Sequence, residues 1–314
     1  MVECRDCAFA YLNPRIQARQ LLEIAPEGCG PALNRPHRRS AFHGGRLLGS
    51  ATRWGLVRYL GYHHLGDAIP PPTIRALARL RLRRLGLKFP RFCGQGRLLD
   101  VGCWTGGYLE RMTEVGWKVA GIELHREAAA MAREVAGEIF VGELMSAPFP
   151  DESFDVVTAF HILEHLDDPL AALRRIVSWV APGGRAIIEV PNFGGLGRRV
   201  FGSHWYGLDL PFHISHFTPE TLTGAIRGAG GQVIQIQHLS DSHYITRSLQ
   251  FLTFDGQSAS AGMLEKFFGL SGGKRFLKVG LSLACRNGLG EAIRVTFGPP
   301  RGRRIRGGSR DRAR

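Results

Sequence analysis

Short apolar runs alternate with stretches of helical periodicity through the middle of the chain. Seven runs have the length and composition of β-strands: RLLDV (97–101), WKVAGIE (117–123), EIFVG (138–142), FDVVTAF (154–160), RAIIEV (185–190), QVIQIQHL (232–239) and EAIRVTF (291–297). The stretches between them predict helices over 106–115, 125–136, 169–180 and 218–229. Strands that alternate with helices favour right-handed βαβ units and a mainly parallel sheet with helices on both faces.

The two ends of the chain lack this alternation. Residues 1–72 are rich in Pro, Gly, His and Arg, and we expect a basic, irregular N-terminal extension that carries one partial knuckle, Cys4-x-x-Cys7. A basic amphipathic helix is predicted over 73–89, opened by Pro72. The main domain is expected to span 73–298, with an insertion at about 240–289, and the Arg-rich residues 299–314 are expected to form a disordered tail.

The net charge of +14, from 41 basic and 27 acidic side chains, belongs to these ends. Residues 1–96 carry net +11 and residues 299–314 net +6, whereas 97–298 carry net −3. A solvated tail is the simpler interpretation, and weak contact with an anionic membrane surface or with nucleic acid is the alternative that stays open.

The turn after the first strand carries the most chemistry. In LLDVGCWTGGYL, Asp100 is followed by Gly102, Gly106 and Gly107, just before a helix. Ligands of doubly wound sheets bind beyond the carboxyl ends of the strands, where glycines allow the backbone to approach them closely. An acid in this turn would repel a phosphate but suits an ammonium group. Glu123 ends the next strand, where a carboxylate can accept both hydroxyls of a ribose.

This turn resembles the first motif of the class I S-adenosylmethionine-dependent methyltransferases. Four further segments resemble that family in order: GIELHREAAAMA, APFPDESFDVVTAF, FHILEHLDDP and APGGRAIIEVPNF. The segment SHWYGLDLPFHISHFTPETL is similar to the ubiquinone-type small-molecule O-methyltransferases. The resemblance covers about 97–239 and implies an α/β fold. That fold is a Rossmann-like, doubly wound seven-stranded sheet, mostly parallel with an antiparallel last strand.

The resemblance also implies S-adenosylmethionine as cofactor. The residues that match its binding positions are Asp100, Gly102, Cys103, Trp104, Gly106, Glu123, Leu124 and Glu143. Asp100 and Gly102 would flank the methionine part, Glu123 would bind the ribose and Glu143 would lie near the adenine. Trp104 departs from the family pattern, which most often has glycine at that position.

Three histidines are candidates for catalysis. His161 follows the fourth strand, and His213 and His216 lie in the loop after the fifth, so all three are expected near the mouth of the site. A hydroxyl acceptor must lose its proton, and a neutral imidazole can take it. A structural packing role for each histidine stays open.

We predict no bound metal. HILEH (161–165) matches an H-x-x-E-H peptidase pattern, but five residues inside a methyltransferase frame are weak support. In ubiquinone-type relatives a similar turn can hold a divalent ion, yet His161 replaces one of its acids. Cys4 and Cys7 lack a second CxxC, so two free thiols are expected.

The function predicted from the sequence is methyl transfer to a small-molecule acceptor, with a hydroxyl as the expected target. A nucleic-acid methyltransferase is disfavoured because TAFHILEH has no Pro-Pro-aromatic clamp for a flipped base. A non-catalytic cofactor-binding scaffold at a membrane surface is the other alternative. The scattered cysteines, and the lack of a secretory signal or an apolar run of about 20 residues, favour a cytoplasmic location.

Overall fold

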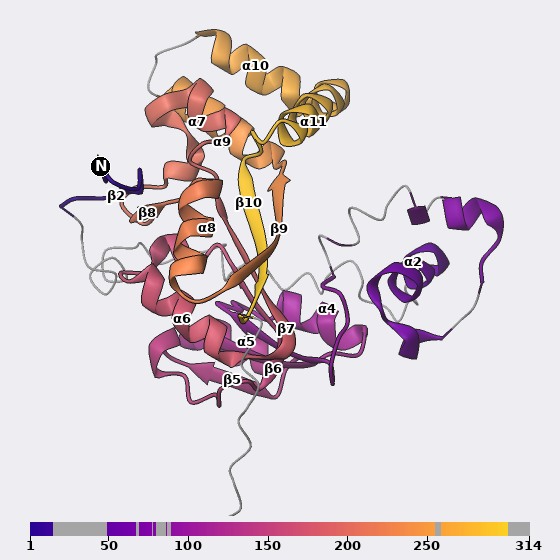
Figure 1. Ribbon diagram of the computed structural model, residues 1–314. Helices are drawn as coiled ribbons and strands as arrows, with labels where there is room; N and C mark the ends of the chain where they lie inside the picture. Colours follow the sequence, from indigo (N-terminus) through magenta and orange to yellow (C-terminus); the bar gives the residue numbers. More distant parts are fainter. Residues whose placement is uncertain are drawn as a thin grey trace, which may run out of the picture.

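The computed structural model describes residues 1–14, 49–66, 69–76, 78–79, 86, 89–254 and 259–300. Its centre is a seven-stranded sheet with the strand order β5-β4-β3-β6-β7-β10-β9 (Figure 1). The strands are β3 (Arg97–Val101), β4 (Lys118–Glu123), β5 (Glu138–Val141), β6 (Phe154–Phe160), β7 (Val180–Pro191), β9 (Gln232–Leu239) and β10 (Ala292–Gly298). All seven predicted strands are present, and the only large change in length is at β7, which begins five residues earlier than predicted.

The strand directions confirm the predicted fold class. β3 pairs in parallel with both β4 and β6, and β6 pairs in parallel with β7. β10 is antiparallel to β7 on one side and to β9 on the other. The last strand of the chain is therefore the antiparallel one, and β9 runs in the same direction as β7.

Helices cover both faces of the sheet, as Figure 1 shows. On one face, α6 (Pro169–Trp179) and α8 (Pro219–Gly228) bury Leu173 and Leu222 against the strands. On the other face, α4 (Gly107–Glu114) and α5 (Arg126–Arg133) bury Leu109 and Ala132. Side-chain caps begin two of these helices, because Asp168 accepts the N–H of Ala171 and Thr218 accepts that of Thr221. All four predicted helices are therefore present.

Part of the expected N-terminal extension packs against the second face. Helix α2 (Ser50–Leu60) contributes Leu56 to the core, and the fully buried Tyr62 lies between α2 and a turn of 3₁₀ helix, η1 (His63–Leu65). The Tyr62 hydroxyl donates to the Pro90 carbonyl at 2.7 Å and accepts from the Trp117 indole at 2.9 Å. Where irregular chain was expected at 50–65, the structure thus has a helix and buried side chains.

The structure describes only part of the residues on which the other predictions for the two ends of the chain were made. Within the predicted helix at 73–89, the described residues 73–76, 78–79 and 86 are helical and Phe89 lies in a bend. The rest of that helix, residues 301–314 and Cys29 lie outside the described residues.

The first residues of the chain reach the opposite side of the molecule. Strands β1 (Val2–Glu3) and β2 (Ala10–Tyr11) form a small antiparallel sheet with β8 (Ser215–His216). Ala10 pairs with His216, and Phe9 packs on Phe217 with ring centroids 5.2 Å apart. The N-terminus therefore lies beside the loop that follows β7 (Figure 1).

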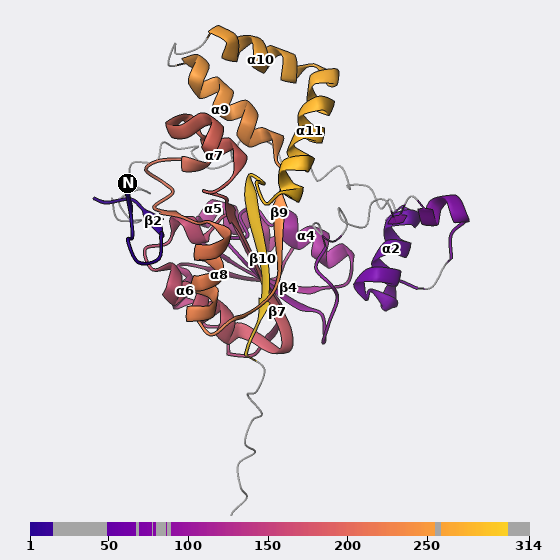
Figure 2. The same ribbon diagram turned by 45° about the horizontal axis from the view of Figure 1, so that its top comes forward.

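The insertion after β9 forms three helices, which we call the cap. They are α9 (Ser242–Phe254), α10 (Ala259–Gly269) and α11 (Ser271–Arg286). The cap begins where β9 ends, and β9 runs parallel to β7. It therefore stands over the edge where the parallel strands end, next to α7 (Leu196–Phe201), as Figure 2 shows. Among the described residues, no helix combines the length and apolar character needed to cross a membrane.

Candidate functional site

The carboxyl ends of β3, β4 and β6 meet at one edge of the sheet. Asp100 lies at the end of β3, Glu123 ends β4 and His161 directly follows β6. The strand order reverses at β3, because β4 and β5 lie on one side of it in the sheet and β6 and β7 lie on the other. Such a reversal of strand order opens a crevice for a ligand.

The turn between β3 and α4 is built on left-handed backbone. Gly102 has φ +75° and Gly106 has φ +81°, and a Cβ at Gly102 would come within 2.1 Å of the Ile162 side chain. Trp104 also has a positive φ, +49°. Glycine adopts this conformation without strain, which explains why the resembling family favours glycine where this chain has Trp104. The Trp104 ring packs edge-on against His125 at 5.5 Å.

The Glu123 carboxylate is held by two backbone groups. One oxygen accepts the N–H of Trp104 at 2.8 Å and the other accepts that of His125 at 2.9 Å, and the residue is 5% exposed. Each carboxylate oxygen keeps a further lone pair. The side chain is thus fixed in place and still able to accept two neighbouring hydroxyls.

Asp100 is buried and receives a hydrogen bond of 2.6 Å from the Thr158 hydroxyl. Burial is the main influence on this carboxyl and raises its pKa to about 7; the Thr158 bond opposes that rise and the charge of Glu123 adds to it. A cation placed beside Asp100 would lower this pKa again, because it favours the ionised form. Asp100 and Glu123 together make this part of the crevice suitable for a positively charged ligand.

Three other predicted cofactor residues, Cys103, Leu124 and Glu143, differ in how far they are buried. Cys103 is buried, and its sulfur lies close to Gly121, where a Cβ would approach it to 2.6 Å. Its side chain therefore packs on the sheet. Leu124 is 43% exposed after β4, and the exposed Glu143 follows β5. Both residues lie at the same edge of the sheet.

His161 lies between two acids, the buried Glu164 and the half-buried Glu189. Its Nδ1 lies 3.2 Å from Glu164 and its Nε2 lies 3.3 Å from Glu189, which also pairs with Arg294 at 2.8 Å. Burial lowers the pKa of His161, but the hydrogen bonds to Glu164 and Glu189 outweigh it and raise the pKa to about 10. His161 is therefore a cation at neutral pH. Glu189 and Arg294 were not predicted from the sequence; the signal was a charged residue inside each of two apolar strands.

A second cluster lies on the other side of Glu164. The Nδ1 atom of His165 lies 3.0 Å from the Phe212 carbonyl and that of His213 lies 2.9 Å from the Gly207 carbonyl, so each ring donates there and keeps Nε2 as an acceptor. Ligand atoms of Glu164, His165 and His213 all lie within 4.8 Å of one another, and Glu164 Oε2 is buried without a hydrogen-bond partner. These residues could hold a divalent ion. The absence of a metal stays a prediction.

His213 and His216 differ from His161 in charge. Burial lowers the pKa of His213, although Glu164 opposes the change. Burial also lowers the pKa of His216, to about 4, helped by the charges of His213 and Arg198. Both rings are neutral at pH 7. His216 is enclosed by the pairing of β8 with β2 and by Phe193 at 5.3 Å, and its Nε2 atom is buried without a partner.

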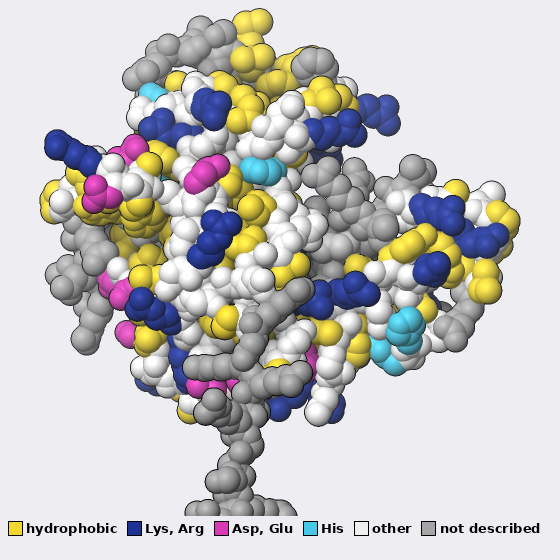
Figure 3. Space-filling model, in the orientation of Figure 1, with side chains coloured by type: hydrophobic (Ala, Val, Ile, Leu, Met, Phe, Trp, Pro, Cys, Tyr) yellow, Lys and Arg dark blue, Asp and Glu magenta, His cyan; other side chains and the backbone are white. Residues whose placement is uncertain are grey.

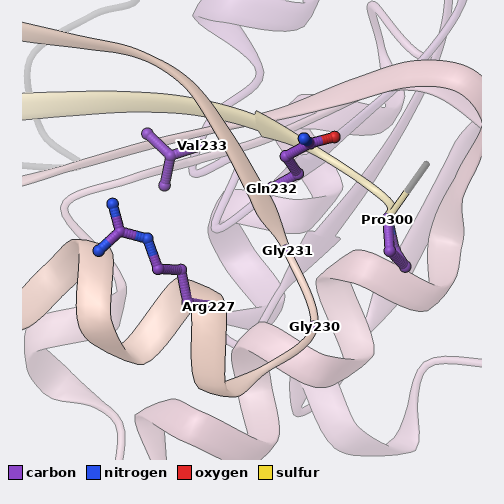
Figure 4. Close-up of a pocket in the computed structure, with 6 residues that line it drawn as sticks. All are labelled: Arg227, Gly230, Gly231, Gln232, Val233 and Pro300. Carbon is purple, nitrogen blue, oxygen red and sulfur yellow. The ribbon is translucent and has the colours of Figure 1, made fainter.

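A surface hollow of about 520 Å³ lies away from this edge. Figure 4 shows its lining, which is Arg227, Gly230, Gly231, Gln232, Val233 and Pro300. It opens at the start of β9 and the end of β10, at the amino ends of the parallel strands. With Arg227 as its single charged side chain, it offers neither acid nor base for catalysis. The chemistry belongs to the carboxyl edge.

Comparison with known proteins identifies a family for most of the sheet. A family model for a methyltransferase domain matches residues 72–236, just over half of the chain. The ubiquinone biosynthesis O-methyltransferase of Aeromonas salmonicida is 31% identical over 169 residues, which cover 49% of this chain and 69% of that protein. The protein of the same name from Xanthomonas euvesicatoria is 29% identical over 189 residues, which cover 56% and 77%.

The chain is also similar to solved structures. One of them is a SAM-dependent methyltransferase from Archaeoglobus fulgidus, which is 22% identical with a TM-score of 0.45. The match covers 71% of this chain and 93% of that one.

Proposed function

Because the chain belongs to the S-adenosylmethionine-dependent methyltransferases, we propose that it transfers the methyl group to a hydroxyl of a small molecule. The observation that carries the proposal is the fixed pair of buried acids, Asp100 and Glu123, at the ends of neighbouring strands. The acceptor class follows from the names of the two relatives, which are O-methyltransferases.

The proposed cofactor pose uses each group for one part of the molecule. Glu123 accepts the two ribose hydroxyls, and Asp100 lies beside the ammonium of the methionine part. Gly102, Cys103, Trp104 and Gly106 contribute the turn that follows the methionine part, and Leu124 and Glu143 border the adenine. The cofactor's sulfonium and ammonium are cations, so a crevice with buried carboxylates attracts it.

His213 is the proposed general base. Its Nδ1–H donates to Gly207, which leaves the Nε2 lone pair able to accept a proton, and its lowered pKa keeps the ring neutral at pH 7. As the acceptor oxygen forms its bond to the methyl carbon, the carbon–sulfur bond breaks and its electron pair stays on sulfur. The hydroxyl proton passes to Nε2 of His213.

The other two histidines take different parts in this proposal. His161 is already protonated at neutral pH, so it acts as a positive charge near the mouth instead of as a base. His216 is neutral but enclosed, so it is the second candidate base, behind His213. Alignment of the acceptor with the methyl group supplies much of the rate in such a displacement.

We also propose that the enzyme works in the cytoplasm and that its partners are the small-molecule acceptor and, weakly, an anionic membrane surface. Nucleic acid is not among the proposed partners, because the strand end at Phe160–His161 offers no clamp for a flipped base.

The test has two steps. Mass spectrometry of the purified protein should detect retained S-adenosylmethionine or its demethylated product. The protein with labelled cofactor is then incubated with cell extract that has been separated into small molecules, nucleic acid and protein. Label is expected in the small-molecule fraction, in an alkali-stable ether, and much less of it with the Glu123→Ala variant at limiting cofactor. Label confined to the nucleic-acid or protein fraction would refute the proposed acceptor class.

A further inference from the structure

The cap presents an apolar surface on its outer side. Among the described residues of the cap, five large apolar side chains are more than half exposed: Phe254 at 91%, Met263 at 74%, Leu270 at 64%, Val279 at 58% and Leu283 at 53%. Scattered exposed apolar residues need no explanation, but a concentration of them on one structural unit marks an interaction site.

These side chains follow the helical repeat. On α10, Met263 and Phe267 are four residues apart, so they lie on one face, and Leu270 follows the end of this helix directly. On α11, Val279 and Leu283 do the same. The inward side of the cap has its own core, in which Leu281 of α11 packs with Ile245 and Leu249 of α9. The cap helices therefore have a second apolar face that none of the described residues covers.

Basic residues border this face. Residues 242–286 contain six basic and two acidic side chains. On α11 the exposed residues Arg275, Val279, Leu283 and Arg286 follow one another at spacings of four, four and three, and Lys278 is exposed beside them. Figure 3 shows dark blue and yellow side chains together over this end of the molecule. Helices with apolar residues flanked by Lys and Arg bind in the plane of an anionic bilayer. A second copy of the chain is disfavoured as the occupant, because two like-charged faces would meet.

We propose that the outer face of α10 and α11 docks on an anionic lipid bilayer. Phe267, Met263 and Leu283 enter the acyl boundary, and Arg275, Lys278 and Arg286 contact the headgroups. The cap is joined to the loop of the catalytic edge, since the Ser248 hydroxyl of α9 accepts the N–H of Tyr206 at 2.9 Å. Docking would thus bring the mouth of the crevice close to the membrane surface. The inference rests on the membrane contact proposed above, but not on methyl transfer.

The test is flotation of the full chain with vesicles. Vesicles of phosphatidylcholine alone are compared with vesicles that also contain phosphatidylglycerol, at low and at physiological salt. Wild type is expected to float only with the anionic vesicles. Arg275→Gln with Lys278→Gln should lower the partition coefficient about 25-fold, because each basic residue near such a surface contributes about a factor of five. The matched control, Arg227→Gln with Ile234→Ser on a remote surface, should bind like wild type.

A second measurement reports the apolar contact. In the Phe267→Trp variant, lipids brominated in the acyl chain should quench the added fluorescence, whereas in Ile234→Trp they should not. Cofactor affinity and circular dichroism of every variant confirm that the protein is folded, which separates a failure of docking from a failure of the proposed function.

Three outcomes would overturn the proposal. The first is wild type found only in the vesicle-free fraction. The second is a charge variant that floats as well as wild type, which would assign binding to the basic ends of the chain. The third is sedimentation that shows a dimer which the cap variants dissociate, since a second copy would then be the occupant.

Discussion

Replacing Glu123 with Ala removes the group on which the proposed cofactor site depends most. A hydrogen bond to a charged group contributes about 1.5–3 kcal/mol, and each 1.4 kcal/mol is a factor of ten in affinity. The carboxylate is fixed by the N–H groups of Trp104 and His125, so little entropy is lost when it binds the ribose. We therefore expect Glu123→Ala to weaken cofactor binding by about 10- to 100-fold.

Because Glu123→Ala also removes the two contacts with the backbone N–H groups, a second variant that keeps the shape of the side chain is needed. Glu123→Gln keeps the shape, but its amide NH₂ must face one of two backbone donors, at Trp104 or at His125. We expect it to bind the cofactor more weakly than wild type as well. Titration calorimetry with S-adenosylmethionine and its demethylated product measures both variants.

The control is Glu127→Ala, which removes an exposed acid four residues further along the chain. It should bind like wild type. If Glu123→Ala binds within twofold of wild type while folded, the ribose lies elsewhere and the proposed pose is refuted.

Three further predictions follow from buried polar groups. His213→Ala should lower turnover about 10²–10⁴-fold in single-turnover assays while cofactor affinity stays unchanged, whereas equal turnover would assign the base elsewhere. His216 has a folded pKa of about 4, below the ordinary 6.5, so its neutral ring favours folding above pH 6.5 and loses that advantage as the pH falls toward 4. Urea unfolding should therefore show wild type losing about 2 kcal/mol more than His216→Phe between pH 7 and pH 5. Tyr62→Phe should cost about 1–3 kcal/mol by leaving the Trp117 indole N–H without its acceptor, whereas Tyr59→Phe at the surface should change the unfolding midpoint little.

The sequence predicted the sheet well because burial on both faces makes parallel strands read as apolar runs. The exception is the first half of β7, where Ala181-Pro182-Gly183-Gly184 carries no strand signal. Helix α2 was missed because its buried residues, Gly55, Leu56 and Val57, are consecutive and give no helical period. Its Leu56 joins a core cluster that also holds Trp117, far along the chain.

Some residues of the candidate site could be predicted from the sequence and others could not. Asp100 and Glu123 could be predicted because each lies at a strand end beside a distinctive turn. The pair of Glu189 and Arg294 could not, because the two residues are 105 positions apart and meet only through the register of β7 and β10. The charges of the three histidines also depend on such contacts. His161 looks like a base in the sequence and is a cation in the structure because two acids from different elements surround it.

The pairing of β2 with β8 has a consequence for how the chain is made. Ala10 leaves the ribosome before its partner His216, which follows more than two hundred positions later. At about 5–20 residues per second, the N-terminal strand waits at least about ten seconds for its partner. The Rossmann-like strands β3 to β7 can assemble in that time, so the small sheet closes over His216 as a late step of biosynthesis. Pulse-labelled nascent chains should accordingly become protected from protease over β3–β7 before residues 1–14 do.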